Sequence, residues 1–420
     1  MAERVVVVGA GMVGLMAAYS LRRRGFDVTL LDAGEAGRGC SFGNAGFICP
    51  SLCAPLPAPG LASQSLRWMF ERQSPLYIRP SALPKLLPWL LAFWRHCNHR
   101  DYAAGFEAML DLNRTTLTLY DRLASDGVAF EMHEQGLLFV FLDARRLASE
   151  LRELEDAARA LGLPAPVALD RDRALAAEPA LSDRVVGALL APAERHVEPR
   201  SLSLGLRSRL LDMGVDLLER TPVTGFERHG DAVSAARCCG TAIAGDAFVL
   251  AAGVFTGPLA AWLGVRLPLT AGKGYSVTVS GANLSFAHAI YLAGTKAVLS
   301  PFEGAVRIAG TMELSGVNDV LDPLRVAGLR AAVGRHLRTE LCGAKEEAWT
   351  GMRPLTPDGL PVIGRLAPLA NVFACTGHGA NGIFMAPASA ELLADWLTGE
   401  VSAQAAAPFD PGRFRRPLPA

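Results

Sequence analysis

The apolar positions at the N-terminus change from a continuous run to a helical spacing and back. Val5 to Val8 is a β-branched run, which favours a strand buried on both faces. From Met12 to Arg24 the apolar residues recur at helical spacing, and Val28 to Leu31 forms a second apolar run. The pattern predicts a strand, a helix and a second strand, which is how a doubly wound parallel sheet begins.

Similar patterns return late in the chain. Ala247 to Thr256 predicts a strand that runs into Ala-Ala-Gly, with a helix starting near Pro258. Within Asn371 to Gly399 we expect a short strand at Val372 to Ala374, a glycine-rich turn, and a helix from about Ile383. We therefore expect these segments to join the N-terminal unit in one sheet.

The middle of the chain predicts different elements. Asp143 to Leu161 is typical of a charged amphipathic helix, and Thr221 to Ala251 of short meandering strands. Pro268 to Met312 predicts antiparallel strands. No internal repeat is evident, so the fold class is α/β with an α+β elaboration.

Composition excludes several classes of protein. Lys and Arg total 41 and Asp and Glu total 41, so no general nucleic-acid partner is indicated. Half of the residues are apolar, but the uncharged runs Val5 to Leu21 and Phe248 to Val265 contain glycines that favour strand, turn and helix over a membrane span. The eight cysteines show no CxxC spacing, so we expect no metal site and reduced thiols in a cytoplasmic protein.

The sequence GAGMVG follows the first predicted strand and carries a dinucleotide-binding fingerprint. Gly9 permits a tight turn, Gly11 lets a pyrophosphate approach the backbone, and Gly14 lets the helix pack on the strand. Asp32 ends the second predicted strand, where a carboxylate accepts hydrogen bonds from a ribose diol. We expect a dinucleotide here, but the fingerprint reads only the ADP half that FAD and NAD share.

The loop RGCSFGNAGFICPS, residues 38 to 51, carries one charge and is rich in small residues. Gly43, Ala45 and Gly46 suit close approach of the backbone to a cofactor. Ser41 and Asn44 offer hydrogen-bonding side chains, and Arg38 in the same loop offers a cation for phosphate. A surface loop with incidental glycines is the alternative.

Seven segments, in this order, resemble those of the FAD-dependent D-amino-acid oxidase superfamily, and within it the bacterial D-amino-acid dehydrogenases. The resemblance covers nearly the whole chain and is weakest over residues 65–192. The segments are GAGMVG with Asp32, SFGNAGFICPS, HVEPRSL (His196 to Leu202), GKGYSV (Gly272 to Val277), IAGTMELSG (Ile308 to Gly316), GMRPLTPDGLPVIG (Gly351 to Gly364) and TGHGANGIFMAP (Thr376 to Pro387).

The resemblance implies FAD as the cofactor, and it places the loop at residues 38–51 over the pyrophosphate, the ribityl chain and the isoalloxazine edge. Some relatives attach flavin to a cysteine near the C-terminal glycine turn. Cys375 lies beside that turn, but we expect it in the core and the FAD noncovalent. The predicted cofactor-binding residues are Gly9, Gly11, Met12, Val13, Gly14, Asp32, Ala33, Arg38, Ser41, Asn44, Ala45, Gly46, Val223, Ala252, Gly253, Gly377, Gly379, Ala380, Asn381, Gly382 and Ile383.

Three residues are candidates for the chemistry of amino-acid oxidation. Arg353 suits a substrate carboxylate, since its guanidinium binds in a planar, bidentate way, and the resemblance places the family's carboxylate-binding arginine in this motif. A structural ion pair with Asp358 is the alternative. Tyr275 offers a hydroxyl to the carboxylate or the amine, or packs in the sheet. His378 is a candidate donor near the flavin pyrimidine, or a capping residue; Lys273 faces either the flavin or solvent.

The expected FAD-binding domain comprises residues 1–60, 193–270 and 350–400, and the substrate domain residues 61–192 and 271–349. Residues 401–420 are rich in proline and are expected to be loose or to wrap the surface. Leu83 to Arg100 predicts a short apolar helix, which is either part of the substrate domain or a peripheral contact with the inner membrane or a partner.

The implied activity is oxidative deamination of amino acids, favouring the D enantiomers, with hydride transfer from Cα to flavin N5 and electrons passed to a respiratory-chain acceptor such as a quinone or another protein. An oxidase that uses oxygen and a flavin subunit of a multi-subunit dehydrogenase remain alternatives. An NAD-dependent dehydrogenase is disfavoured, because no second dinucleotide-binding crossover is evident.

Overall fold

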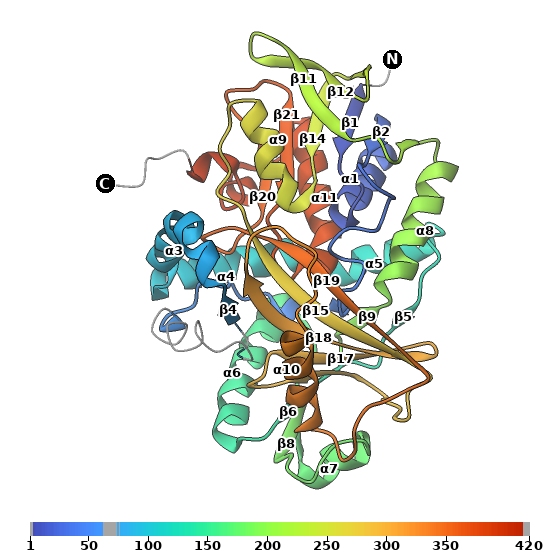
Figure 1. The fold of residues 1–420 in the computed structure, drawn as a ribbon, viewed down its shortest axis with the longest axis vertical. Helices are drawn as coiled ribbons and strands as arrows, with labels where there is room; N and C mark the ends of the chain where they lie inside the picture. The colour runs from blue at the N-terminus through green and yellow to red at the C-terminus, as the bar shows by residue number, and fades with distance from the viewer. Residues whose placement is uncertain (1–2, 62–73, 75, 415–420) are drawn as a thin grey trace.

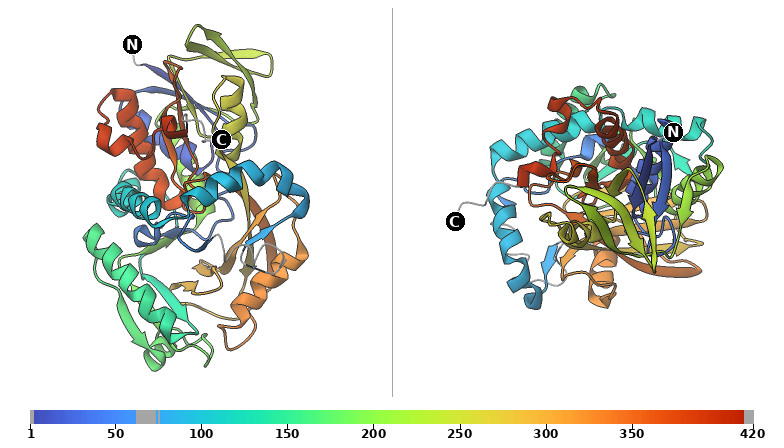
Figure 2. Two further views of the ribbon diagram at one scale, coloured as in Figure 1. Left: turned by 90° about the vertical axis from the view of Figure 1, so that its left-hand side faces the viewer. Right: turned by 90° about the horizontal axis from the view of Figure 1, so that it is seen from above.

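A computed structural model describes residues 3–61, 74 and 76–414. Two halves form the described chain, each built on its own large sheet (Figure 1). The strands β11 (Val223–His229) and β12 (Ala232–Cys238) lie at the outer end of one half, and the helix α7 (Arg171–Ala177) lies at the far end of the other (Figure 1 and Figure 2).

The first half has a six-stranded sheet in the order β10-β2-β1-β14-β21-β20. All neighbouring strands run parallel except β20 and β21. The strands are β1 (Arg4–Val8), β2 (Asp27–Leu31), β10 (Asp216–Leu218), β14 (Ala247–Leu250), β20 (Val362–Arg365) and β21 (Val372–Thr376).

Helices cover one face of this sheet, and a small sheet covers the other. The helices α1 (Met12–Arg23), α8 (Pro199–Asp212) and α11 (Gly382–Thr398) pack together, with α11 also against α4 (His99–Asn113) and α5 (Thr116–Ser125). On the opposite face lie α9 (Thr256–Trp262) and the antiparallel strands β11 (Val223–His229), β12 (Ala232–Cys238) and β13 (Thr241–Ala244). The strands β1, β2, β14 and β21 are buried on both faces over nearly their whole length, as their continuous apolar runs predict.

The second half has a nine-stranded sheet in the order β19-β15-β18-β17-β16-β6-β8-β7, with β4 paired to β18. Most neighbouring strands are antiparallel; β16 with β6 and β18 with β4 are parallel. The strands are β4 (Leu76–Ile78), β6 (Leu137–Phe141), β7 (Val167–Asp170), β8 (Gly187–Ala191), β15 (Thr270–Ser280), β16 (Ala289–Leu292), β17 (Ala297–Phe302), β18 (Ala305–Leu314) and β19 (Lys345–Leu355).

Short elements complete the described chain. The helices α7 (Arg171–Ala177) and α10 (Pro323–Gly334) pack on the second sheet, and α10 contacts β15 and β18. A three-stranded sheet of β3 (Phe47–Ile48), β9 (Arg195–Val197) and β5 (Met132–His133) links the loop after β2 to the start of α8.

The predicted fold class is confirmed, and so are the predicted strand–helix–strand start, the amphipathic helix α6 (Ala144–Leu161) and the antiparallel strands between Pro268 and Met312. The expected domain boundaries stay a prediction. Of the two expectations for the tail, the structure favours one that wraps the surface over a loose one for residues 403–414. The helix α12 (Ala403–Ala406) is followed by Phe409, which is 3% exposed, and Arg413 pairs with Asp358 at 2.7 Å.

The apolar segment from Leu83 forms the helix α3 (Leu83–His96). On its buried side, Leu86 and Leu90 pack against strands of the second half. Phe93 is also buried, whereas Leu87 and Leu91 are exposed. Among the described residues, no helix has the length and apolar character needed to cross a membrane.

Candidate active site

A cavity of about 1370 Å³ lies between the two halves and is bordered by both large sheets. Small-molecule sites usually occupy about 300–1,000 Å³. The extra volume suits a cofactor together with a substrate. One end is bordered by the N-terminus of α1 and the other by strands β15, β18 and β19 and the helix α3.

The three fingerprint glycines differ in their surroundings, and those of Gly9 and Gly14 match the turn and the helix packing predicted for them. Gly9 has φ +106°, and a Cβ there would lie 2.7 Å from the backbone of Ala252. A Cβ at Gly14 would overlap the carbonyl oxygen of Gly9, so this glycine allows the helix to pack on the strand. A Cβ at Gly11 would meet nothing within 4 Å, and Gly11 borders the cavity. The space beside Gly11 is therefore open to a ligand.

Asp32 is held in place by the backbone. Its Oδ2 accepts a hydrogen bond from the Ala10 N–H at 2.6 Å, and its Oδ1 accepts one from the Gly34 N–H at 2.7 Å. Asp32 borders the cavity, and its remaining lone pairs can accept the hydroxyls of a ribose. This position agrees with the predicted role.

The loop after β2 borders the cavity, but two of its glycines are small for a different reason from the one predicted. A Cβ at Gly43 would overlap the indole of Trp349, and one at Gly46 would overlap the carbonyl oxygen of Val197. These contacts are with protein, so close approach to a cofactor is not needed to explain either glycine. Ser41 and Ala45 do border the cavity.

Asn44 fixes the shape of this loop. Its Oδ1 accepts a hydrogen bond from the Gly46 N–H at 2.8 Å, and its Nδ2 lies 3.5 Å from the carbonyl oxygen of Ala380. Asn44 thus joins the loop to the glycine turn before α11. Arg38 borders the cavity but pairs with Glu35 at 2.6 Å, and its side chain is 64% exposed, so its contact with phosphate stays a prediction.

The glycine turn opens the N-terminus of α11 toward the cavity. No acidic residue lies in the first turn of α11, and no side chain caps its first N–H groups. Such a terminus stabilises negative charge.

Most predicted cofactor-binding residues border the cavity, namely Gly9, Gly11, Met12, Val13, Asp32, Ala33, Arg38, Ser41, Asn44, Ala45, Val223, Ala252, Gly253, Gly379, Ala380, Asn381 and Gly382. Gly14, Gly46, Gly377 and Ile383 do not.

Arg353 borders the cavity beside the strand β15. Its Nη1 donates to the carbonyl oxygen of Thr311 at 2.7 Å, and a Cβ at Gly274 would lie 2.5 Å from its guanidinium carbon. Burial lowers the pKa of Arg353 to about 10, which leaves it charged at neutral pH. Among the described residues no carboxylate pairs with it, and Asp358 pairs with Arg413 instead. The alternative of a structural ion pair between Arg353 and Asp358 is therefore not found among the described residues.

Tyr275 does not meet Arg353. It borders the cavity, but its side chain belongs to the core on the α10 side of β15, opposite the face of Gly274. Its hydroxyl donates to Glu313 at 2.5 Å, and burial and this hydrogen bond raise the pKa of the phenol. Lys273 is fully buried and pairs with Glu313 at 3.1 Å, so it faces neither the cavity nor solvent. The geometry favours the packing alternative for Tyr275.

His378 borders the cavity and is 4% exposed. Its Nε2 lies 3.0 Å from Ser389 Oγ, and its Nδ1 has no hydrogen-bond partner among the described residues. Burial lowers the pKa of His378 to about 3, so the ring is neutral at physiological pH. A buried nitrogen without a partner beside a cavity suits a ligand contact.

Several residues of the site were missed from the sequence. Thr311 has φ +55°, unusual for a β-branched residue, in an irregular part of the pairing between β15 and β18. Trp89 and Phe93 of α3 stack at 5.3 Å between ring centroids and border the cavity. The glycines that flank Lys273 are the signal that could have indicated close neighbours on that strand face: a Cβ at Gly272 would meet Leu355, and one at Gly274 would meet Arg353.

A pair of substitutions tests this division of roles. Gly11→Val should leave the unfolding temperature of the cofactor-free protein nearly unchanged, because the space beside Gly11 is open, but should abolish dinucleotide retention. Gly14→Ala should lower the unfolding temperature, because its Cβ overlaps Gly9. Thermal unfolding and cofactor content, measured on the same samples, distinguish the two. Full cofactor content in Gly11→Val would show that the phosphate site lies elsewhere.

Comparisons with known proteins give the cofactor. Residues 4–396 match the family described as FAD dependent oxidoreductase. The chain is 35% identical over 405 residues to a D-amino acid dehydrogenase of Cereibacter sphaeroides, covering 94% of this chain and 92% of that protein. It is 32% identical over 404 residues to a D-amino acid dehydrogenase of Rhizobium rhizogenes, covering 94% and 96%.

Solved structures share the fold at lower identity. Glycine oxidase from Geobacillus kaustophilus superposes with a TM-score of 0.75 at 22% identity, covering 97% of this chain and 98% of that one. L-proline dehydrogenase from P. horikoshii superposes with a TM-score of 0.76 at 19% identity, covering 99% and 98%. With the family match over nearly its whole length, the chain belongs to the FAD dependent oxidoreductase family.

Proposed function

We propose that this FAD-dependent oxidoreductase is a D-amino-acid dehydrogenase. It oxidises the substrate at Cα to an imino acid, which water hydrolyses to a 2-oxo acid and ammonia. The observation that carries the proposal is the guanidinium of Arg353, which lies half-buried beside the cavity without a carboxylate partner among the described residues. The preference for D enantiomers is supported by the two curated relatives, both named D-amino acid dehydrogenase.

Arg353 binds the substrate carboxylate in this proposal. A buried cation without a counter-ion is costly, and a bidentate carboxylate provides the missing charge. The hydrogen bond to Thr311 and the contact over Gly274 fix the plane of the guanidinium before a substrate arrives. Preorganisation of this kind reduces the entropy lost on binding and orients Cα–H for transfer.

FAD supplies the acceptor for the hydride that leaves Cα. The residues of this chain bind, orient and exclude water. Trp89, Phe93 and Met312 add apolar side chains to the lining of the cavity that Arg353 borders, and an apolar lining lowers the local dielectric and strengthens a carboxylate contact. No side chain is needed as a base when the amine arrives neutral, since the hydride leaves directly.

His378 contributes a neutral ring to the cofactor site. When Ser389 Oγ donates to Nε2, the proton of the ring lies on Nδ1, a buried donor in a residue that borders the cavity and without a partner among the described residues. Such a donor stabilises the negative charge that a flavin gains on reduction. We propose this role in preference to a purely structural cap, because Nδ1 otherwise lacks a partner among the described residues.

The electrons leave for an acceptor such as a quinone or a second protein. The names of the relatives support a dehydrogenase, although glycine oxidase shares the fold. A peripheral membrane contact of α3 stays a prediction, to which the exposed Leu87 and Leu91 would contribute.

We expect the FAD to be noncovalent. Cys375 borders the cavity but is fully buried, and burial raises the pKa of its thiol, so the nucleophilic thiolate is disfavoured. Denaturation followed by filtration should release all the flavin into the filtrate. Flavin that stays with the precipitated chain would show a covalent bond.

Substitution of Arg353 tests the substrate site. Arg353→Lys keeps the charge but loses the bidentate geometry, so kcat/KM for amino acids should fall by about a hundredfold or more. Arg353→Ala should lose more. Oxidation of amines that lack a carboxylate should change little, because they never use this contact. Steady-state kinetics with a dye acceptor measures kcat/KM of both variants for amino acids and for amines.

Flavin content and unfolding temperature serve as controls on the same preparations. Both should match the parent protein if Arg353 acts on the substrate. Unchanged kinetics for amino acids in either variant would contradict the assignment, and so would an equal loss for amino acids and amines. A fall in stability and flavin content alone would assign Arg353 a structural role.

A further inference from the structure

Arg307 is a buried arginine that joins three separate parts of the chain. It lies in β18, is 1% exposed, and its guanidinium lies 5.0 Å from the ring centroid of Phe302. Its Nε donates to Thr278 Oγ1 at 2.9 Å, its Nη1 to the carbonyl oxygen of Asn44 at 2.8 Å, and its Nη2 to Glu198 Oε1 at 3.1 Å. All three nitrogens of the side chain are therefore in use.

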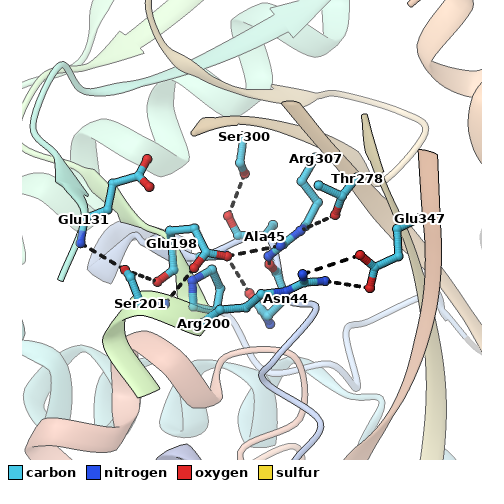
Figure 3. A network of polar contacts seen from close by, with 12 residues as sticks. Asn44, Ala45, Glu131, Glu198, Arg200, Ser201, Thr278, Ser300, Arg307 and Glu347 are labelled. Atoms are coloured by element: carbon cyan, nitrogen blue, oxygen red, sulfur yellow. Dashed lines mark hydrogen bonds and ion pairs between the residues drawn. The ribbon is translucent and has the colours of Figure 1, made fainter. Parts of the chain in front are cut away.

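The partners of Arg307 come from β15, from the loop after β2 and from the start of α8 (Figure 3). Glu198 is itself fixed, because its Oε2 accepts a hydrogen bond from the Ser201 N–H at 2.7 Å and caps α8. Ser300 in β17 adds a second anchor to the loop, donating to the carbonyl oxygen of Ala45 at 2.6 Å. Two successive carbonyls of the loop are thus bound to the second sheet.

These two anchors determine where the intervening N–H points. In a trans peptide the carbonyl and the following N–H point in opposite directions. Because the carbonyl of Asn44 faces Arg307, the N–H of Ala45 faces away from Arg307. Ala45 borders the cavity, and among the described residues its N–H donates to no protein group. The next N–H, of Gly46, is taken by Asn44 Oδ1.

We propose that Arg307, together with Ser300, is a positioning residue for FAD. By holding the carbonyls of Asn44 and Ala45 against the second sheet, the pair turns the N–H of Ala45 into the cavity, where it donates a hydrogen bond to a polar atom of the flavin. The inference rests on the FAD dependence of the family and not on the substrate, so it survives if the proposed D-amino-acid specificity fails.

The test uses Arg307→Lys and Ser300→Ala, with Arg22→Lys as a matched control. Lys keeps the charge of Arg307 but cannot bind three acceptors in one plane. Arg22 also donates to two backbone carbonyls, those of Met213 and Phe26, but does not border the cavity. For each protein we would measure the FAD dissociation constant, the visible flavin spectrum, the reduction potential and the unfolding temperature of the cofactor-free form.

FAD affinity should fall by about tenfold in Arg307→Lys and by several-fold in Ser300→Ala, as expected for a lost or misdirected hydrogen bond. The spectrum and the reduction potential should also shift, which a general loss of stability would not cause. Arg22→Lys should keep the parental FAD affinity, flavin spectrum and reduction potential.

If Arg307→Lys does not fold, Ser300→Ala decides, since it removes only a hydroxyl. Parental affinity, spectrum and potential in the folded variants would overturn the proposal and leave Arg307 as a structural link between the two halves. A similar loss of FAD in Arg22→Lys would overturn it as well, by showing that affinity follows stability.

Discussion

A half-buried positive charge beside a cavity sets the central constraint on this molecule. Arg353 is held by the carbonyl of Thr311 and lies over Gly274, but no carboxylate among the described residues neutralises it. Burial alone would favour loss of the charge, and it lowers the pKa to about 10, which is still too high for the group to be neutral at physiological pH. This is why we propose an anion, the substrate carboxylate, as the partner of Arg353, and the absence of a side chain at Gly274 leaves room for the guanidinium.

The rest of the architecture brings this site to a dinucleotide. The parallel sheet presents the N-termini of α1 and α11 at one side of the cavity, where backbone N–H groups favour phosphate and reduced flavin. The nine-stranded sheet presents Arg353 at the other side. The loop from Arg38 to Gly46 spans the two, and the buried contacts of Arg307 and Ser300 join it to the second sheet. In the proposed function, these contacts hold the cofactor side and the substrate side of the cavity in register.

Much of this arrangement could be predicted from the sequence, because local patterns determine it. Runs of β-branched residues predicted the strands of the parallel sheet, and the glycine spacing predicted the tight turn at Gly9 and the helix packing at Gly14. The predictions that were wrong concern residues whose role depends on a neighbour distant in the sequence. Pairing with β18 and packing against α10 determine which side of β15 each residue faces. The hydroxyl of Tyr275 therefore could not be placed from GKGYSV alone. Gly43 is small because of Trp349, a residue distant in sequence, and the tail from Ala403 packs because Asp358 and Arg413 meet.

Anaerobic reduction of the purified protein tests the central claim most directly, because it joins cofactor, carboxylate site and stereochemistry in one observation. The yellow protein, mixed without oxygen with a D-amino acid, its L enantiomer or the corresponding amine, would be followed at the visible flavin bands. The account predicts rapid bleaching by the D-amino acid and much slower bleaching by the other two. Equal bleaching by the amine and the D-amino acid would contradict a carboxylate site at Arg353, and a colourless protein that depends on a nicotinamide would contradict the account as a whole.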